Sequence, residues 1–482
     1  MTVVLPPPQL LIGGRWLDAA AGSIAVINPS DGEPFARIAR GESRDIDAAV
    51  RAARVAIDGA WGRMPALERG RLLMKLAQAV QDDHETLSRL EAMDTGKPLK
   101  QAKADIVALA RYFEFYGGSA DKLHGHTIPY LDGYSVMTFY EPLGVTAHII
   151  PWNYPAQILG RSLGAALAVG NAAVVKPAED ACLSVLRVGE LALAVGFPEG
   201  AVNIVTGYGE EAGAALAAHP GIDHISFTGS PETGALVQAA AARNNRPVTM
   251  ELGGKSPQVV FADADLDASL PFLVGAIIQN AGQTCSAGSR LLIEHGAYDR
   301  VMDKVSQRFA ALRVGSSDMD LDLGPVINKQ QKQRVETYLD RARKDGLKTC
   351  AQGAMASNAP PGGYYVLPTL VGAVPPQHAL AQEEVFGPVL AATPFRDESE
   401  ALAIANGTEY GLVASVWTSD GARQLRVARA LKAGQVFVNN YGAGGGVELP
   451  FGGVKRSGFG REKGFEALHG FAALKTVAVK HG

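Results

Sequence analysis

Cysteine is scarce in this sequence of 482 residues, and the three cysteines, Cys182, Cys285 and Cys350, are scattered along the chain. So few thiols cannot form the disulfide framework that stabilises many small secreted domains. The N-terminal residues also lack a basic segment ahead of their short apolar run, so no secretory signal is indicated. We therefore expect free thiols, a reducing compartment and a cytoplasmic location.

Charge of one sign is not in excess. The chain has 45 Lys and Arg against 49 Asp and Glu, a net charge of −4, and it lacks the basic surplus that binding to nucleic acid needs. The longest stretch without a charge, residues 268–289, could span a bilayer by length, but it contains Gln279, Asn280 and Gln283. We expect a buried segment of a soluble protein, with neither nucleic acid nor membrane as a partner.

Metal-ligating residues are sparse as well. His124 and His126 lie two residues apart, which would place them on one face of a strand. No cysteine or carboxylate cluster nearby completes a coordination set, so no metal is expected.

Apolar residues, 47% of the chain against 20% charged, are instead arranged as in a large α/β protein. Residues 43–118 have a helical pattern that begins at Ser43, a candidate N-cap, and breaks at 62–65 and 96–98. Beyond residue 144, short apolar runs alternate with helical stretches, which predicts a doubly wound parallel sheet and then a second α/β unit. The predicted strands are 145–150, 172–175, 202–205, 224–227, 248–252, 290–293, 412–417 and 436–438.

Two segments fit neither unit. Residues 126–140 and 472–480 alternate apolar and polar side chains, which is typical of exposed strands. Exposed strands need a neighbour for their unpaired edges. Another copy of the chain would supply one, so a homo-oligomer is expected.

Three stretches offer candidate catalytic residues. Cys285 lies in a glycine-bracketed turn, where a thiol could act as a nucleophile or could simply be a small buried side chain. Glu251 ends an apolar strand before two glycines, which suits a desolvated general base, although an ion pair with Lys255 is the alternative. Asn153, in the loop Pro151–Pro155, could donate to an oxyanion or could belong to a purely structural loop.

Seven motifs in register identify the chain as similar to one family. They are PWNYP (151–155), KPAE (176–179), FTGSPETG (227–234), ELGGKSP (251–257), GQTCSAGSR (282–290), EEVFGPV (383–389) and PFGGVKRSGFGRE (450–462). In this order they closely resemble the NAD(P)-dependent aldehyde dehydrogenase superfamily. The resemblance covers nearly the whole chain.

The resemblance implies roles for the three candidates. Cys285 would attack a small-molecule aldehyde, and Asn153 with the Cys285 N–H would hold the oxyanion. Glu251 would activate the water that hydrolyses the thioester to the acid, without transfer to coenzyme A. A thiol esterase or acyl transferase, or a non-catalytic relative, are the alternatives that these residues leave open.

The cofactor implied is NAD, with NADP as the alternative. Lys176 and Glu179 would contact the adenosine ribose, and Ser230 the pyrophosphate at a helix start. Glu384 and Phe386 would hold the nicotinamide ribose. The remaining expected cofactor residues are Pro151, Trp152, Gly229 and Leu252.

The substrate residues are where the chain departs from the family. Ser162 stands where many members have a lysine, and Arg161 stands where many have a tryptophan. Arg161 therefore predicts a substrate with an anionic or strongly hydrogen-bonding far end, unless it pairs with a protein carboxylate or leans on an aromatic ring. Tyr154 and Phe451 are expected as the aromatic walls of the substrate tunnel.

Domain limits can be predicted from the same patterns. Residues 1–120 and 142–251 are expected to bind NAD, and residues 252–463 to form the catalytic domain. A small β oligomerisation arm would combine residues 121–141 and 464–482, in a homodimer or homotetramer.

Overall fold

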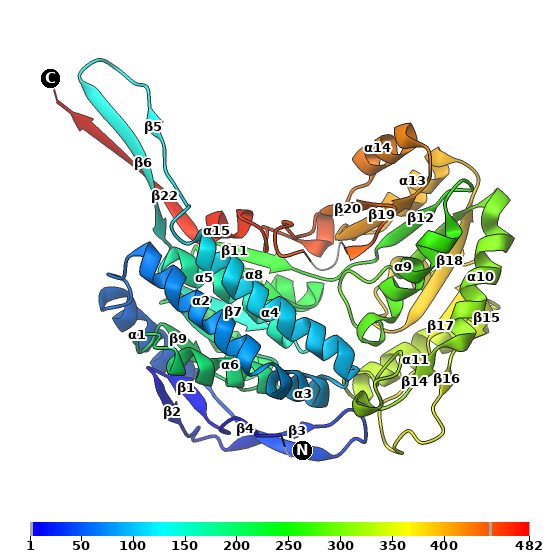
Figure 1. The fold of residues 1–482 in the computed structure, drawn as a ribbon, viewed down its shortest axis with the longest axis horizontal. Helices are drawn as coiled ribbons and strands as arrows, with labels where there is room; N and C mark the ends of the chain where they lie inside the picture. Colours follow the sequence, from blue (N-terminus) through cyan, green and yellow to red (C-terminus); the bar gives the residue numbers. More distant parts are fainter. Residues whose placement is uncertain (1–2, 443–445, 482) are drawn as a thin grey trace.

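The computed structural model describes residues 3–442 and 446–481. Two mixed α/β halves lie side by side, and a small β-sheet projects from one of them (Figure 1). Each half contains its own sheet and hydrophobic core. This arrangement confirms the predicted fold class of two α/β units with a β arm.

The first half is built on an eight-stranded sheet in the order β2-β1-β9-β8-β7-β10-β11-β21. Its five central strands are parallel, whereas β1 and β21 pair antiparallel at the two sides. The strands are β1 (Leu10–Ile12), β2 (Arg15–Leu17), β7 (Val145–Ile150), β8 (Ala172–Pro177), β9 (Val202–Ile204), β10 (His224–Thr228), β11 (Val248–Glu251) and β21 (Gly458–Phe459).

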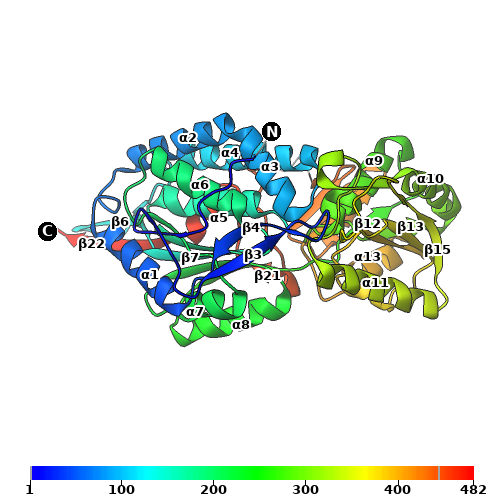
Figure 2. The same ribbon diagram turned by 90° about the horizontal axis from the view of Figure 1, so that it is seen from below.

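Helices cover both faces of this sheet, as a doubly wound fold requires. In Figure 2, α2, α4 and α6 lie on one side of the sheet, and α1, α7 and α8 lie on the other. The helices are α1 (Ser43–Asp58), α2 (Ala66–Asp82), α3 (His84–Thr95), α4 (Leu99–Ser119), α5 (Pro155–Val169), α6 (Leu183–Ala194), α7 (Ala214–Ala218) and α8 (Pro231–Arg243).

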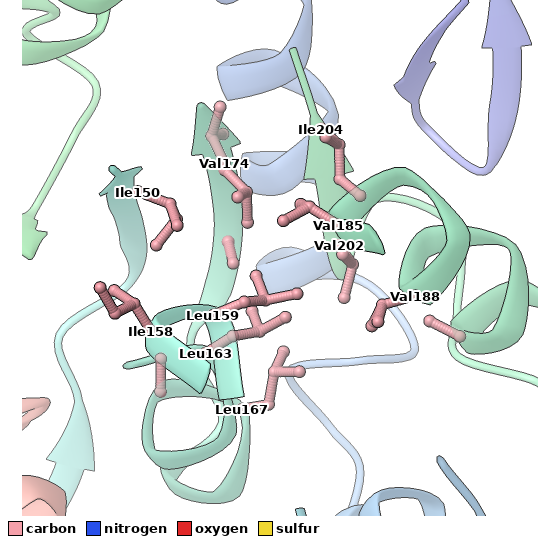
Figure 3. Close-up of a cluster of buried hydrophobic side chains, with 14 of the residues drawn as sticks. Ile150, Ile158, Leu159, Leu163, Leu167, Val174, Val185, Val188, Val202 and Ile204 are labelled. Carbon is pink, nitrogen blue, oxygen red and sulfur yellow. The ribbon is translucent and has the colours of Figure 1, made fainter. Parts of the chain in front are cut away.

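Between the sheet and α5 and α6 lies an aliphatic core. Leu159 and Leu163 of α5 face Val174 of β8, and Val185 of α6 reaches the same layer (Figure 3). All four side chains are buried. Since α5 follows β7 directly, this packing fixes the loop between them, which carries Asn153.

The second half contains a seven-stranded sheet in the order β15-β17-β18-β13-β12-β19-β20, parallel except for β15. Its strands are β12 (Pro257–Val260), β13 (Arg290–Glu294), β15 (Lys348–Gln352), β17 (Thr369–Gly372), β18 (Val389–Phe395), β19 (Val413–Trp417) and β20 (Gln435–Val438). Its helices are α9 (Leu266–Ile278), α10 (Tyr298–Ala311), α11 (Lys329–Lys344), α12 (Ala379–Gln382), α13 (Glu398–Asn406) and α14 (Gly421–Ala430).

The projecting arm joins two distant parts of the chain. Strand β6 (Tyr134–Pro142) pairs antiparallel with β22 (Ala472–Lys480) on one side and with β5 (Thr127–Ile128) on the other. Figure 1 shows this sheet extending away from the body. The remaining elements are α15 (Glu466–Gly470) and two small sheets, β3 (Ser23–Ile27) with β4 (Pro34–Ala39) and β14 (Arg313–Val314) with β16 (Ala354–Met355).

Some local expectations differ from the structure. Helix α1 is capped by Glu42 rather than by Ser43, because the Glu42 side chain and Asp45 form a reciprocal capping box. The segment 268–289 contributes most of α9 and then turns at 279–282. In the two described ranges, no helix combines the length and the apolar character needed to cross a bilayer.

Candidate active site

The predicted catalytic residues lie where the first sheet faces the second half. Asn153 follows the carboxyl end of β7, and Glu251 is the last residue of β11. Cys285 lies in the loop between the turn 279–282 and β13. Ligands of open α/β sheets bind at the carboxyl ends of the strands, so the sheet order places these groups at a natural binding edge.

Two cavities meet at this edge. One has a volume of about 920 Å³ and the other of about 290 Å³. Among the described residues, only Asn153 and Cys285 line both cavities. The thiol of Cys285 and the side-chain amide of Asn153 therefore lie at the junction of the two cavities.

A strained turn presents Cys285. Asn280 and Ala281 have left-handed φ angles of 49° and 52°, and Gly282 follows at 74°. A Cβ atom on Gly282 would lie 2.2 Å from the carbonyl oxygen of Gly387, so glycine is required there. Burial raises the pKa of the Cys285 thiol to about 12, against a lowering effect of Arg161. The thiol therefore has to lose its proton before its sulfur can act as a nucleophile.

Both the side-chain amide and the backbone carbonyl of Asn153 form hydrogen bonds. Its Nδ2 donates to the backbone oxygen of Gln283 over 2.9 Å, which leaves the second amide hydrogen for a ligand. Its own carbonyl oxygen accepts from Lys97 Nζ at 3.0 Å and from Asn280 Nδ2 at 2.8 Å. Asn153 is buried. The amide therefore has a fixed direction beside Cys285.

A buried ionic cluster lies behind Asn153; we call Glu91, Lys97 and Asp105 the Lys97 cluster. Lys97 Nζ is 3.1 Å from Glu91 Oε1 and 2.6 Å from Asp105 Oδ2. All three side chains are buried. The ammonium also lies 4.3 Å from the centre of the Tyr154 ring. Sequence reasoning missed this cluster, and its one signal was the helix break at residues 96–98.

A second buried cluster consists of Arg161, Glu251 and Glu462, and the charges of Arg161 and Glu251 act on Cys285; we call it the Glu251 cluster. Arg161 forms an ion pair with Glu462, donates to Thr228 Oγ1 over 3.1 Å, and lies 5.2 Å above the Phe451 ring. Glu251 is only 1% exposed, and neither of its carboxylate oxygens has a hydrogen-bond partner.

The members of the Glu251 cluster have opposite effects on the pKa of Glu251. Burial raises the pKa of Glu251 well above its ordinary value, and the charge of Glu462 raises it further, whereas Arg161 lowers it. A carboxyl with a raised pKa is a stronger base than an ordinary glutamate. Glu251 thus has the environment of a general base, and Arg161 moderates it.

The larger cavity receives most of the predicted cofactor residues. Its lining includes Pro151, Trp152, Gly229, Ser230, Glu384 and Phe386. Lys176, Glu179 and Leu252 are not part of that lining, although Asp180, next to Glu179, is. Lys176 Nζ and Glu179 Oε2 form an ion pair of 3.0 Å.

This cavity fits a dinucleotide. Ser230 caps α8 by accepting from the Thr233 N–H, so a helix N-terminus, a site for anions, opens on the cavity. At the far end, the rings of Trp152 and Phe386 meet edge to face at 5.4 Å. Glu384 accepts from the Gly254 N–H over 2.8 Å, and burial raises its pKa to about 7.

The smaller cavity has the predicted aromatic walls, Tyr154 and Phe451, and Arg161 also lines it. Phe437 and Tyr441 are further aromatic walls that the sequence analysis missed, because their strand and loop carry no motif. Its polar lining includes Gln157, Gln279, Gln435 and Lys463. Within the described residues, no group of three or more His, Cys, Asp or Glu could hold a metal ion.

Comparisons with known proteins agree with this geometry. Residues 16–477 match the model of the aldehyde dehydrogenase family. The chain is 41% identical to hydroxyisobutyraldehyde dehydrogenase of Mycolicibacterium austroafricanum, over 98% of this chain and 94% of that protein. It is also 41% identical to human retinal dehydrogenase 2, over 98% and 92%.

Solved structures give the same result. PnpE from Pseudomonas sp. WBC-3, solved in complex with nicotinamide adenine dinucleotide, is 42% identical and superimposes with a TM-score of 0.95, over 98% of this chain and 97% of that one. A Burkholderia cenocepacia protein described as an aldehyde dehydrogenase is 65% identical, with a TM-score of 0.98 over 98% and 100%. This chain therefore belongs to the aldehyde dehydrogenase family, and it is an NAD-dependent oxidoreductase that converts an aldehyde to the carboxylic acid.

Proposed function

We propose that Cys285, Asn153 and Glu251 carry the reaction. The single observation behind this proposal is that Asn153 and Cys285 line both cavities, so that, among the described residues, these two alone adjoin both a group bound in the smaller cavity and one bound in the larger cavity. A cofactor-free esterase would have no use for the larger cavity. Its volume of about 920 Å³ supports the dehydrogenase over that alternative.

In the first half-reaction the Cys285 thiol releases its proton to water, and the thiolate sulfur adds to the aldehyde carbon. The carbonyl oxygen becomes an oxyanion, held by the free amide hydrogen of Asn153 and by the Cys285 N–H. NAD bound in the larger cavity would supply the acceptor for the hydride of that carbon, and loss of the hydride would leave a thioester on Cys285.

In the second half-reaction Glu251 removes a proton from water, which attacks the thioester carbon. The carbon–sulfur bond breaks, the acid leaves, and Cys285 returns as a thiol. Glu251 suits this step because its oxygens have no hydrogen-bond partner that would compete for a proton. The proton that Glu251 took from water passes to the departing sulfur, and the thiol proton lost in the first half-reaction is the one released overall.

Asn153→Ala tests the oxyanion role. In a single turnover we expect hydride transfer, followed at 340 nm, to slow ~10²- to 10³-fold, since an oxyanion donor contributes that much. NAD binding should stay within about twofold. Gln279→Ala is the matched control, because it removes an exposed amide from the same cavity. A wild-type rate for Asn153→Ala contradicts the proposal.

We also propose that the enzyme prefers NAD to NADP. The Glu179 carboxylate, oriented by Lys176, can accept from the 2′-hydroxyl of the adenosine ribose but repels a 2′-phosphate. A ratio of kcat/KM values of ~10 or more in favour of NAD is expected. Equal efficiency with both cofactors contradicts it.

For Arg161 we propose a role toward Glu462 rather than toward the substrate. Its guanidinium is already paired with Glu462 and Thr228 and packed on Phe451, which supports a protein carboxylate as its partner over an anionic substrate. Comparing succinic semialdehyde with a neutral aliphatic aldehyde in Arg161→Leu decides between them. A loss confined to the anionic aldehyde would restore Arg161 as a substrate contact.

The domain roles complete the proposal: residues 1–120 and 142–251 bind NAD, 252–463 supply Cys285, and the arm, 121–141 with 464–482, joins subunits in a homodimer or homotetramer. The arm supports this role because Phe139 is 46% and Leu474 56% exposed on its strands. A cytoplasmic location stays a prediction from cysteine usage.

Light scattering tests the arm. We expect Leu474→Asp to lower the molar mass of the particle, because a charge would lie in an apolar contact between subunits. Leu425→Asp is the control, since Leu425 is equally apolar and 69% exposed but lies on α14. An unchanged mass for Leu474→Asp removes that side chain from the interface.

A further inference from the structure

Two donors converge on the backbone carbonyl of Asn153. Lys97 Nζ lies 3.0 Å from this oxygen, and Asn280 Nδ2 lies 2.8 Å from it. Most peptide carbonyls in a loop have one partner or water. Here a buried ammonium ion and a buried amide are both directed at one oxygen, that of the residue we assign to the oxyanion.

The ammonium is itself fixed from the opposite side. Its two carboxylate partners are held in turn: Glu91 Oε2 accepts from Ser184 Oγ over 2.5 Å, and Asp105 Oδ1 accepts from Gln157 Nε2 over 2.6 Å. A buried ion pair adds little net stability compared with apolar residues, because desolvation offsets the attraction. Such a network does fix the position of its members. Here it fixes the Lys97 ammonium, which donates to the carbonyl oxygen of Asn153.

The same ammonium also contacts the next residue. It lies 4.3 Å from the centre of the Tyr154 ring, a cation–π contact. The Tyr154 hydroxyl is 2.9 Å from Thr284 Oγ1, and Thr284 precedes Cys285. Lys97 therefore contacts Asn153, the proposed oxyanion donor, directly. Through Tyr154 it is also linked to Thr284, in the loop that carries Cys285.

The backbone leaves Lys97 little freedom. Gly96 ends α3 in the left-handed region, with φ of 80°, and Pro98 follows before α4 begins. A Cβ atom on Gly96 would lie 2.8 Å from Pro325 and 2.9 Å from Pro29, so the turn is closely packed. The turn directs the lysine inward between two helices.

We propose that Lys97 is a positioning residue for the oxyanion site: it fixes the peptide of Asn153 and, through Tyr154, the loop that carries Cys285. This inference rests on the proposed role of Asn153. Removal of the ammonium should slow formation of the thioester and should leave NAD binding unchanged, because a small displacement of a catalytic group costs up to ~10²-fold in rate.

Three variants and a control test this inference. Lys97→Met leaves two buried carboxylates without a cation, so Lys97→Met/Asp105→Asn is made beside it to reduce the uncompensated charge. Asn280→Ala removes the second donor to the same oxygen without changing any charge. Asp94→Asn is the control, because Asp94 is a buried carboxylate of α3 that bonds the Leu183 N–H and not Lys97.

The measurement is the single-turnover rate of hydride transfer per active site, together with the Kd for NAD. We expect a ~10- to 100-fold slower rate for the double variant and a smaller loss for Asn280→Ala. The Kd for NAD should change less than about twofold, and Asp94→Asn should react at the wild-type rate. A wild-type rate for the double variant overturns the inference, and so does a wild-type rate for Asn280→Ala if the Lys97 variants do not fold.

A double-mutant cycle separates positioning from general damage. If Lys97 acts through Asn153, its replacement should have little further effect in an Asn153→Ala background. Fully multiplicative losses would instead mean that Lys97 acts elsewhere, and the inference would fail while the role of Asn153 stands. If Asn153→Ala alone reacts normally, the proposed function fails first, and the inference fails with it.

Discussion

The two ionic clusters beside Cys285 are both buried, yet they differ in hydrogen bonding. In the Lys97 cluster the ammonium has two carboxylates, a carbonyl and an aromatic ring as partners. In the Glu251 cluster the pair of Arg161 with Glu462 is formed, but both oxygens of Glu251 lack a partner. The three charged groups of the Lys97 cluster are all paired, whereas Glu251 in the other cluster has neither a hydrogen bond nor an ion pair with the described residues.

The difference fits the role that we propose for each group. A side chain that holds a backbone in place works best when all its hydrogen bonds are made. A general base works only if an oxygen is free to take a proton, and the cost of that freedom is a buried polar group without a partner. The hydrogen bonding of the site therefore separates a holding role from a reacting role.

The largest expected effect comes from the thiol between the clusters. Cys285→Ser should lower turnover ~10³-fold or more, because a hydroxyl is far less ionised than a thiol and is a weaker nucleophile. Without the nucleophile neither the oxyanion nor the thioester forms, so neither cluster can affect the rate. The Kd for NAD should change little. Steady-state rates and NAD titration check this, and near wild-type turnover would refute the mechanism.

Glu251→Gln should affect only the steps after hydride transfer. We expect a burst of about one NADH per active site at a normal rate, and then turnover slowed ~10²- to 10³-fold as the thioester accumulates. Stopped-flow absorbance measures the burst, and intact-protein mass spectrometry detects the acyl group. The Lys97 variants should do the reverse, with a slow first turnover. If both sets of variants slow the same step, the contrast between the clusters is wrong.

Arg161→Leu should shift the pH dependence of thioester hydrolysis. Arg161 lowers the pKa of Glu251, so its removal raises that pKa, and hydrolysis needs a higher pH to reach half of its maximal rate. A shift of about one pH unit, or ~10-fold in rate on the acid limb, is expected. Arg161→Lys retains the charge and should shift much less. An unchanged pH profile in Arg161→Leu would mean that Arg161 does not influence the pKa of Glu251.

The smallest effect is on stability. Burial raises the pKa of Glu251 above its value in the unfolded chain, so the folded state binds the extra proton, and stability falls as the pH rises through the raised pKa. Glu251→Gln has no such proton. It should match wild type near pH 4 and unfold with a free energy ~1–2 kcal/mol higher at pH 9. Thermal melting at the two pH values measures this, and equal stability at pH 9 would mean that the carboxylate is solvated.

Much of this site is determined by the order of strands in the sequence. Asn153 and Glu251 each stand at the carboxyl end of an apolar run, and parallel strands bring such ends to one edge. The glycine-rich turn before Cys285 is also a local signal. Periodicity and turn chemistry therefore made these three residues candidates, and the resemblance of the seven motifs to the aldehyde dehydrogenase superfamily selected their roles.

The clusters were not predictable, because they depend on contacts between distant segments. Arg161 on α5 reaches Glu462 beyond β21, and no local pattern fixes which carboxylate it pairs with. Lys97, between a glycine and a proline, has the sequence of an exposed turn. Only the packing of α3, α4 and α5 turns its side chain inward.

The narrow junction between the two cavities has a consequence for redesign of the enzyme. Because only Asn153 and Cys285, among the described residues, line both cavities, each of the other described wall residues lines one cavity alone. Under the proposed function, substitutions at Gln435 or Phe437, which line the smaller cavity alone, should change which aldehydes are accepted and leave dinucleotide binding unchanged. Libraries built on the smaller cavity and on the larger one can thus be screened separately and then recombined in one chain.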